Sequence, residues 1–291
     1  MTSRLEIPKM YKLFIDGKFT RTESERYLDA LNPKNGKKIC NISRASRKDV
    51  RNSVVAARKG FSLWSEKTAY ERGQIMYRFA EMLEGRKDQF TEEIFVSTKQ
   101  NSAGCRKEVQ KAVDRIVFYS GFCDKWIQLS GSVNPVQSGY FNFSIPEPTG
   151  IVGIILPDTL SLLPLISRLS AVTASGNSCI IIANESAPLP ALSIAEVIAT
   201  SDFPAGVINI LTGKKSELTP HLAGHFDVNA VDVCADKNTD RKSLQELCSN
   251  NVKRFNFIKP DHDWFNDSDN ENLKEIEKFS ELKTVWHTMG M

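Results

Sequence analysis

Residues 150–164, Gly150-Ile-Val-Gly-Ile-Ile-Leu-Pro-Asp-Thr-Leu-Ser-Leu-Leu-Pro164, combine a short apolar run, a proline and a second apolar run. The first run has the length of a buried strand, and the second fits the start of a helix, with Pro157 at the turn between them. Open α/β sheets bind ligands in the crevice beyond the carboxyl ends of their strands. We therefore expect residues near Pro157 to line such a crevice, with Asp158 and Thr159 as its first polar residues.

The chain after Gly150 alternates strand-like and helix-like segments with short connections. Strands are expected at residues 151–156, 178–182, 207–211, 230–234 and 254–258. Helices are expected at residues 162–174, 188–200, 216–223 and 239–248. Apolar strands separated by helices predict a parallel sheet that is covered on both faces. The fold class is therefore α/β, with a Rossmann-like domain over residues 148–260.

Residues 1–130 are expected to form an extended segment and then helices that pack on this domain. Asp16-Gly17 lies between two short apolar runs, which is a hairpin signal. Ser46-Arg-Lys-Asp49 has the form of a capping box at the start of a helix that ends near Trp64. Further helices are expected at residues 71–83, 88–98 and 105–126, and no chemistry is expected in them.

Alternation with the period of a strand returns at residue 133. Residues 133–137 and 139–146 are expected to form a hairpin. One face of its second strand then carries Tyr140, Asn142 and Ser144, and the other carries Phe141, Phe143 and Ile145. Residues 261–281 are acidic and rich in turn formers, which predicts a mobile linker. A short β-prone run at residues 282–287 follows it.

The composition is that of an ordinary soluble protein, with 291 residues, 41% hydrophobic and 25% charged. A net charge of +3 is too small to predict a nucleic-acid partner, and the basic runs at 34–38 and 44–51 have acidic neighbours, which indicates a solvated surface. The amino terminus has no signal-peptide core, and no apolar run is long enough to span a membrane. We expect a cytoplasmic protein that binds neither nucleic acid nor membrane.

The six cysteines lie at positions 40, 105, 123, 179, 234 and 248 without the paired spacing of a zinc site or a disulfide framework. No metal site is therefore expected. Cys234 ends a predicted strand near the crevice and is the best placed of the six to act as a nucleophile. Its neighbours Asp232 and Asp236 would raise its pKa, however, so a structural role is expected for it.

Several motifs, in order, resemble those of the aldehyde dehydrogenase superfamily. They include Phe14-Ile-Asp-Gly-Lys-Phe19, Leu31-Asn-Pro-Lys-Asn-Gly36, Ala56-Ala-Arg-Lys-Gly-Phe61, Glu147-Pro-Thr-Gly-Ile-Val-Gly153 and Phe203-Pro-Ala-Gly-Val-Ile-Asn-Ile-Leu-Thr-Gly213. The resemblance extends to about residue 235 and implies the Rossmann-like NAD-binding domain of that fold. It also implies that residues 131–147 and 282–291 form a small oligomerisation β-sheet.

The resemblance assigns roles to particular positions of the crevice. In active members an asparagine donates a hydrogen bond to the oxyanion, and here its position falls on Thr159, with Asp158 beside it. Losing one such donor costs about 3 kcal/mol of transition-state stabilisation. The lysine that holds the ribose of the cofactor falls on Ile182. Glu185 and Pro157 remain as cofactor-binding candidates, and Glu185 is equally suited to a helix entry.

The phosphate-binding and catalytic parts of the family pattern match less well. Where the family has Gly-Ser-Thr, the chain has Cys234-Ala-Asp-Lys-Asn238, in which Asp236 would repel a phosphate. The stretch that leads into the family's catalytic domain falls on residues 252–260 without its Glu-Leu-Gly-Gly-Lys sequence. The resemblance therefore implies that the catalytic domain is absent, with its nucleophilic cysteine and general-base glutamate, and no catalytic residue is assigned.

The ending Leu282-Lys-Thr-Val-Trp-His-Thr-Met-Gly290 is similar to that of the second, non-catalytic dehydrogenase-like unit of family 16 aldehyde dehydrogenases. We therefore expect a non-catalytic module without a cofactor that pairs with a copy of itself or with a complete aldehyde dehydrogenase unit. The expected interaction residues are Tyr140, Phe141, Phe143, Ile145, Val285 and Trp286. The alternatives are a residual NAD-binding oxidoreductase acting on aldehydes and a truncated product without function.

Overall fold

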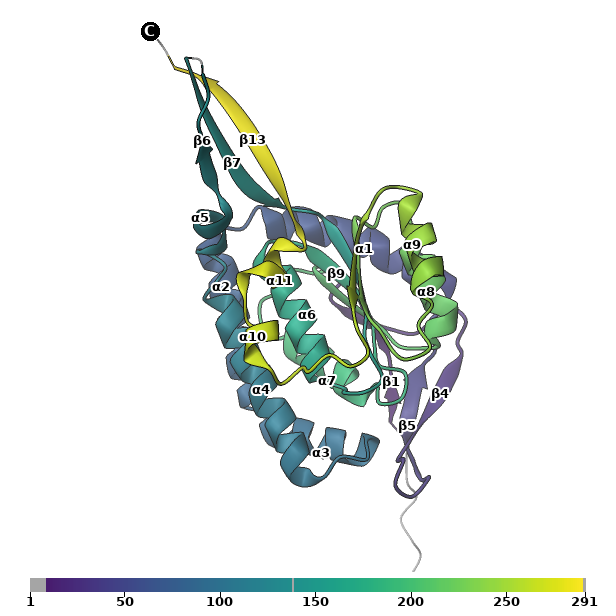
Figure 1. The fold of residues 1–291 in the computed structure, drawn as a ribbon. Coiled ribbons are helices and arrows are strands. Elements are labelled where there is room, and N and C mark those ends of the chain that lie inside the picture. The colour runs from purple at the N-terminus through teal and green to yellow at the C-terminus, as the bar shows by residue number, and fades with distance from the viewer. Residues whose placement is uncertain (1–8, 138, 290–291) are drawn as a thin grey trace, which may run out of the picture.

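The centre of the molecule is a seven-stranded sheet in a computed structural model that describes residues 9–137 and 139–289 (Figure 1). The strand order is β12-β11-β8-β9-β10-β2-β3. Five strands run parallel: β8 (Ile151–Ile155), β9 (Ser178–Ile182), β10 (Ile208–Leu211), β11 (Ala230–Cys234) and β12 (Arg254–Ile258). They confirm the strands predicted from the alternation, and with them the α/β fold class.

The predicted Asp16-Gly17 hairpin extends this same sheet. It joins β2 (Leu13–Ile15) to β3 (Lys18–Thr20), and both turn residues have positive φ, at 54° and 69°. Two such residues form the turn that suits the twist of a hairpin. All of β2 is buried, and it pairs antiparallel with β10. The sequence predicted the hairpin but not its position, where it covers the edge of β10.

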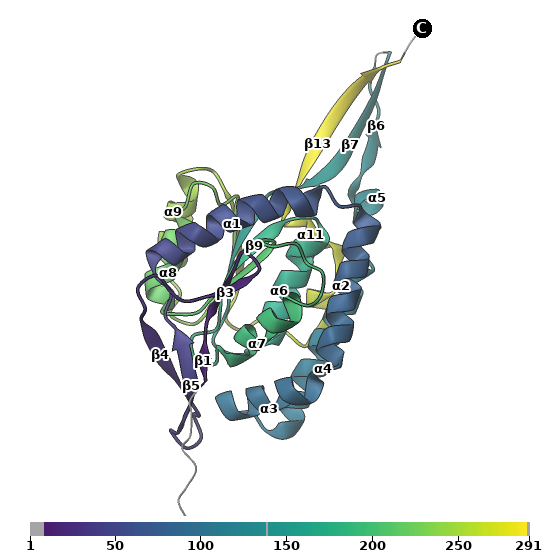
Figure 2. The same ribbon diagram turned by 180° about the vertical axis from the view of Figure 1, so that it is seen from behind.

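Helices cover both faces of the sheet, as Figures 1 and 2 show from opposite sides. One face packs on α1 (Arg47–Ser65), α8 (Lys215–Ala223) and α9 (Arg241–Ser249). The other packs on α6 (Leu163–Ala174) and α7 (Leu189–Ile198). The outer layer against these two helices contains α2 (Ala69–Glu84), α3 (Lys87–Ser97) and α4 (Ser102–Ser120). The alternation of strands and helices therefore produces the predicted two-sided sheet.

Helix α1 begins at the predicted capping box. The side chain of Ser46 accepts from the backbone of Asp49, and the Asp49 carboxylate accepts from the backbone of Ser46 at 2.7 Å. Farther along, α1 approaches the turn before β10 so closely that a Cβ on Gly60 would lie 2.2 Å from the Gly206 carbonyl carbon. Only glycine fits there, so this contact fixes the position of α1 on the sheet.

A small sheet precedes α1 in the chain. Its strands are β1 (Met10–Tyr11), β4 (Tyr27–Leu31) and β5 (Lys38–Ser43), and β5 is the middle one. Ala30, Cys40 and Ile42 of this sheet pack on Leu189 and Leu192 of α7. The extended amino-terminal segment is thus fastened to the central domain by apolar contacts.

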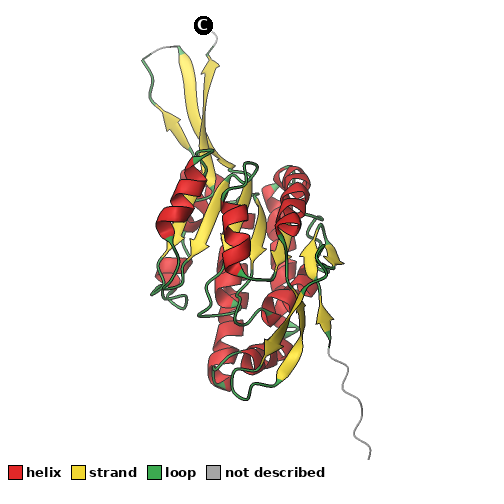
Figure 3. Cartoon of the chain, turned by 90° about the vertical axis from the view of Figure 1, so that its right-hand side faces the viewer, coloured by secondary structure: helices red, strands yellow, loops and turns green. Residues whose placement is uncertain are grey.

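A separate three-stranded sheet projects from the body of the molecule (Figures 1 and 3). It contains β6 (Ser132–Asn134), β7 (Tyr140–Pro148) and β13 (Ser280–Thr288), with β7 in the middle. The short helix α5 (Trp126–Ser130) leads into β6. The predicted hairpin and terminal strand therefore lie side by side, although more than a hundred residues separate them in the sequence. Residues 138, 290 and 291, which these predictions include, lie outside the described residues.

The acidic segment predicted to be a mobile linker is folded, so that prediction is wrong. It contains α10 (Asp267–Asn270) and α11 (Leu273–Glu277), and Trp264, Ile276 and Phe279 are buried in the main core. Its acidic side chains pair with two buried arginines, Arg115 of α4 and Arg168 of α6. The acidic composition is therefore the counter-charge to buried cations rather than a sign of disorder.

Within the two described ranges, no helix combines the length and the apolar character that crossing a bilayer requires.

Candidate functional site

The crevice expected beyond Pro157 is present as a cavity of about 490 Å³. It lies at the carboxyl ends of β8 and β11 and against helices α8 and α9, which is where open α/β sheets bind their ligands. Ile155, Leu244 and Leu247 supply apolar lining. The polar lining includes four carboxylates and one lysine: Asp158, Glu185, Asp236, Asp240 and Lys215.

Lys215 bridges two of these carboxylates. Its Nζ lies 2.9 Å from Asp158 Oδ1 and 2.8 Å from Asp236 Oδ2. The backbone N–H of Asp158 also donates to Asp236 Oδ1 at 2.8 Å. The turn after β8 is thus tied to the turn after β11. The lysine is neutralised within the chain, and it offers no free positive charge to a ligand.

Glu185, one of the two cofactor-binding candidates, binds the amino end of α8. Its carboxylate accepts from Lys214 Nζ at 2.6 Å and from the backbone N–H of Lys215 at 2.8 Å. Partial burial alone would raise the pKa of Glu185, but these hydrogen bonds outweigh it and hold that pKa below its ordinary value. The carboxylate therefore occupies a helix amino terminus, where a ligand phosphate would otherwise be favoured.

The other sequence-predicted positions lie around the same turn. Pro157 is buried beneath it, and Ile182 is fully buried in β9. Thr159 is exposed and lines a second hollow of about 520 Å³, on the side of the turn toward α3. Neither Pro157 nor Ile182 offers a side-chain hydrogen bond to a ligand. Of the predicted cofactor contacts, only Glu185 presents a polar group at the crevice, and its acceptors are already used.

Cys234 does not have the environment of a nucleophile. It is 2% exposed, and burial raises the pKa of its thiol well above the ordinary value, with a further contribution from Asp232. A reactive thiolate needs a lowered pKa and access to substrate. The other five cysteines are buried as well. Among the described residues, no group of three histidine, cysteine or acidic side chains is placed to hold a metal ion.

Sequence reasoning missed Glu108, which holds the helix after the Pro157 turn. This side chain of α4 is fully buried, and its Oε1 accepts from the backbone N–H groups of residues 161, 162 and 163, at 2.7–3.2 Å. Its Oε2 accepts from Gln100 at 2.7 Å. The carboxylate therefore satisfies the amino end of α6. A signal was present, because Glu108 falls on the apolar stripe of α4 between Cys105 and Ala112.

The fold and the crevice can now be compared with those of known proteins. The model of the aldehyde dehydrogenase family matches residues 19–257. The chain belongs to the aldehyde dehydrogenase family. Among curated relatives, DhaS of Bacillus subtilis is 31% identical over 259 residues, which are 87% of this chain and 52% of DhaS. Human mitochondrial 10-formyltetrahydrofolate dehydrogenase is 30% identical over 251 residues, covering 84% of this chain and 27% of the relative.

Solved structures of the family share the fold. An aldehyde dehydrogenase structure from Burkholderia cenocepacia aligns with a TM-score of 0.81 at 31% identity, over 85% of this chain and 50% of that one. A Bacillus cereus aldehyde dehydrogenase in complex with NAD+ aligns with a TM-score of 0.82 at 23% identity, over 86% of this chain and 50% of that one. The chain thus spans about half the length of these structures and of DhaS. The similarity covers the Rossmann-like part of the aldehyde dehydrogenase fold.

Proposed function

We propose that this chain is a non-catalytic, cytoplasmic member of the aldehyde dehydrogenase family that binds a second subunit through its projecting sheet. The partner would be another copy or a complete aldehyde dehydrogenase unit. The observation that carries the proposal is the outer strand β13, which has nine residues and pairs with β7 on one side alone among the described residues. An unpaired strand edge binds another strand through its backbone, without any side-chain chemistry.

The side chains of this sheet also favour a partner. Val133, Phe143 and Val285 are in register across the three strands. Phe141 lies beside Phe143 on the same face, with ring centroids 5.6 Å apart. Val133 is 69% and Phe141 41% exposed. When another protein covers an exposed apolar stripe of a sheet, the free energy of the system falls, because apolar surface is removed from water.

The opposite face combines a polar ladder with an aromatic pair. Asn134 donates to Asn142 and Ser144, and Ser144 shares a hydrogen bond with Thr284. Asn142 and Ser144 are buried. Near the tip, Tyr140 and Trp286 contact each other edge to face, and Trp286 is 60% exposed. Of the six predicted interaction residues, Ile145 lies deepest toward the body, opposite Lys283.

The finer comparison with the second unit of family 16 enzymes is part of this proposal. Between β12 and β13 the chain has only residues 259–279, which contain α10 beside α4 and α11 against α6. The chain thus passes from the central sheet to the projecting sheet through a short folded segment. That short connection favours a unit that contributes strands to a partner, rather than a unit that contains a catalytic site of its own.

The crevice residues do not fit a dinucleotide, which supports the absence of catalysis. Three of its four carboxylates, Glu185, Asp158 and Asp236, are paired with the side chains of Lys214 and Lys215. A pyrophosphate would have to displace Glu185 from α8 and approach Asp158 and Asp236. Each of these carboxylates would oppose the negative charge of the ligand.

Light scattering coupled to size exclusion tests the proposal. We expect the purified chain to form a dimer or larger oligomer, or a complex with a complete family 16 aldehyde dehydrogenase. The double variant Phe141→Asp/Val285→Asp should abolish that association, because it places charges on the apolar stripe. Tyr77→Asp, at a half-exposed position of α2, is the matched control. A wild-type chain that stays monomeric with and without the partner would contradict the proposal.

A residual NAD-binding oxidoreductase is the second candidate, and the retained cavity of about 490 Å³ favours it. Calorimetry with NAD and NADP, beside an aldehyde oxidation assay, distinguishes the two. We expect no saturable heat and no oxidation with the wild-type chain, because the carboxylates at the crevice repel the pyrophosphate. Saturable binding that weakens in Lys215→Ala would establish the second candidate and overturn the first.

A further inference from the structure

A third hollow lies near the carboxyl end of α8, and the proposed pairing of strands does not involve it. It is a cavity of about 350 Å³ between α1 and the end of α8. Its charged and polar lining is entirely basic: Arg47 and Arg51 from α1, His221 from α8, and His225 from the loop after it. Val50 supplies an apolar floor, and Phe226 lies at the edge.

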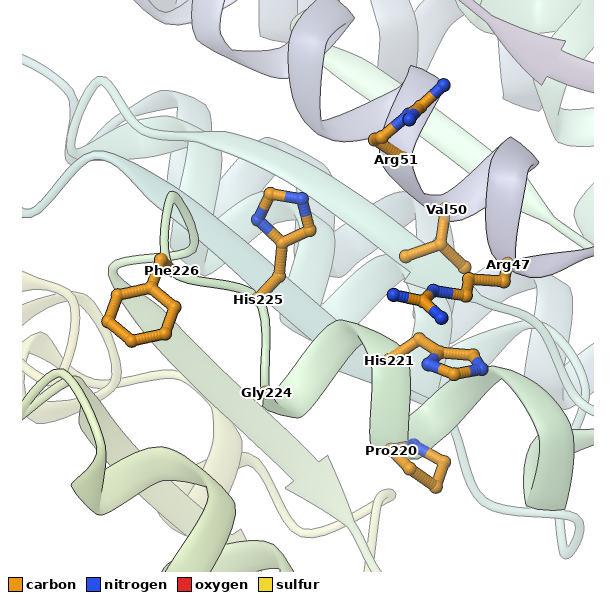
Figure 4. A pocket seen from close by; sticks show the side chains of 8 residues that line it. All are labelled: Arg47, Val50, Arg51, Pro220, His221, Gly224, His225 and Phe226. Carbon is orange, nitrogen blue, oxygen red and sulfur yellow. The ribbon is translucent and has the colours of Figure 1, made fainter.

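The basic side chains surround the hollow from α1, from α8 and from the loop after α8 (Figure 4). The Arg47 guanidinium extends over His221 toward the centre of the hollow, and the His225 ring rises toward α1. Arg51 extends away from the centre. Because Arg47 and Arg51 are four residues apart on α1, they share a face of that helix. Both are exposed, so a change of rotamer brings Arg51 to a ligand without disturbing the core.

These arginines differ from the neighbouring cations in having no partner. Among the described residues, neither Arg47 nor Arg51 makes an ion pair or a side-chain hydrogen bond. By contrast, Lys48 pairs with Glu23 and Arg44 with Glu217. Two unpaired guanidinium groups beside a hollow without a carboxylate produce a positive potential that attracts an anion.

The loop beneath the hollow keeps its own carbonyl groups occupied. Lys253 Nζ donates to the carbonyls of Ala223 and His225, both at 2.7 Å. The backbone N–H of Asp227 donates to His225 Nδ1 at 3.2 Å, which leaves the proton of a neutral ring on Nε2. Partial burial and Lys253 lower the pKa of His225, although Asp227 opposes them. His225 is therefore a neutral donor at pH 7.

We propose that this basic hollow, formed by Arg47, Arg51, His221 and His225, binds a small phosphorylated molecule. Guanidinium groups bind phosphate oxygens through paired N–H donors, and imidazole N–H groups add a third direction of donation. Val50 and Phe226 supply apolar surface for the part of the ligand that carries the phosphate. The site shares Pro220 of α8 with the crevice, but none of its basic residues lines the crevice, and it does not depend on the projecting sheet.

Calorimetry of the full chain at low ionic strength, with inorganic pyrophosphate and with AMP as probes, tests this site. We expect saturable binding of one equivalent that weakens about tenfold or more in Arg47→Gln/Arg51→Gln, because two charge-assisted contacts are lost. Lys48→Gln is the matched control: it removes one positive charge from the same helix outside the hollow, and its affinity should stay within about twofold of wild type.

Two further measurements keep the result unambiguous. Thermal unfolding of the double variant should match that of the wild type, because both arginines are exposed. Lys215→Ala in the crevice should bind the probes as the wild type does. The proposal is overturned if the wild type binds neither probe, if Lys48→Gln loses as much affinity as the double variant, or if Lys215→Ala abolishes binding.

Discussion

Replacing Glu108 with alanine is expected to lower the free energy of unfolding by about 3–5 kcal/mol, among the largest effects of any single change in this chain. The substitution leaves the N–H groups of residues 161–163 without an acceptor at a fully buried helix end. It also removes the acceptor of Gln100 and opens a cavity beside α6. Urea unfolding followed by circular dichroism measures the change.

Glu108→Gln separates the hydrogen bonds from the volume of the side chain. It keeps one acceptor oxygen for the α6 N–H groups. Its new NH2 group, however, faces the NH2 group of Gln100 unless the Gln100 amide rotates by 180°. The free energy of unfolding should therefore fall about half as much as in Glu108→Ala, since one acceptor survives. Glu92→Ala, at an exposed position of α3, is the control and should change stability by less than about 0.5 kcal/mol. An alanine variant at position 108 that is as stable as this control would contradict the role given to Glu108.

The alternation of strands and helices was readable from the sequence because the parallel strands in the middle of the central sheet are mostly apolar and buried. Strands such as Ile151–Ile155 and Ser178–Ile182 are buried on both faces, so their pattern needs no knowledge of a partner. The β2–β3 hairpin was also readable, because its turn chemistry is local. Its place beside β10 was not, since antiparallel addition at an edge leaves no mark within either strand.

The acidic segment shows why local composition misled the prediction. Residues 261–281 carry the counter-charges of Arg115 and Arg168, which lie more than a hundred residues earlier in the chain. Composition measured in one window cannot detect a partner at that distance. A buried arginine does leave a weak signal, because Arg115 falls on the buried stripe of α4 between Ala112 and Tyr119. The same reading would have found Glu108.

The crevice was predicted in part. Asp158 was expected at the crevice and Asp236 was expected to repel a phosphate, and both line the cavity beyond their strands. The bridging role of Lys215 was not predicted, because it depends on where α8 begins relative to two turns that precede and follow it. Glu185 was assigned to either a cofactor or a helix entry, and its carboxylate binds the first N–H of α8.

Replacing Arg168 with methionine is expected to lower the free energy of unfolding by about 3–5 kcal/mol, because it removes the cation paired with the buried Asp232 and one of the two paired with Glu275. Arg168 Nε lies 2.6 Å from Asp232 Oδ2 in β11, and its Nη1 binds Glu275 of α11. Lys242→Met, at an exposed position of α9, is the matched control and should stay within about 0.5 kcal/mol of wild type. Urea unfolding at neutral pH measures both.

The free energy of unfolding that is lost in Arg168→Met should depend on pH in a defined direction. Burial raises the pKa of Glu275, but Arg168 and Lys278 outweigh it and hold that pKa below its ordinary value of 4.5. In the wild type this carboxylate stabilises the fold above pH 4.5 and loses that contribution as the pH falls through its lowered pKa. Without Arg168, burial is opposed mainly by Lys278, so the pKa of Glu275 rises. The difference between variant and wild type should then be smaller near about pH 4 than at neutral pH.

Arg168 also joins the central sheet to the folded acidic segment, which gives the variant a local signature. Hydrogen exchange should accelerate in residues 261–279 of Arg168→Met more than in β8 or β9, because the segment loses its buried anchor while the sheet keeps its own packing. Combining Arg168→Met with Asp232→Asn and Glu275→Gln should restore part of the stability, since neutral side chains no longer need a cation. If exchange rises equally throughout the chain and the triple variant recovers nothing, the arginine acts by filling volume rather than by pairing these carboxylates.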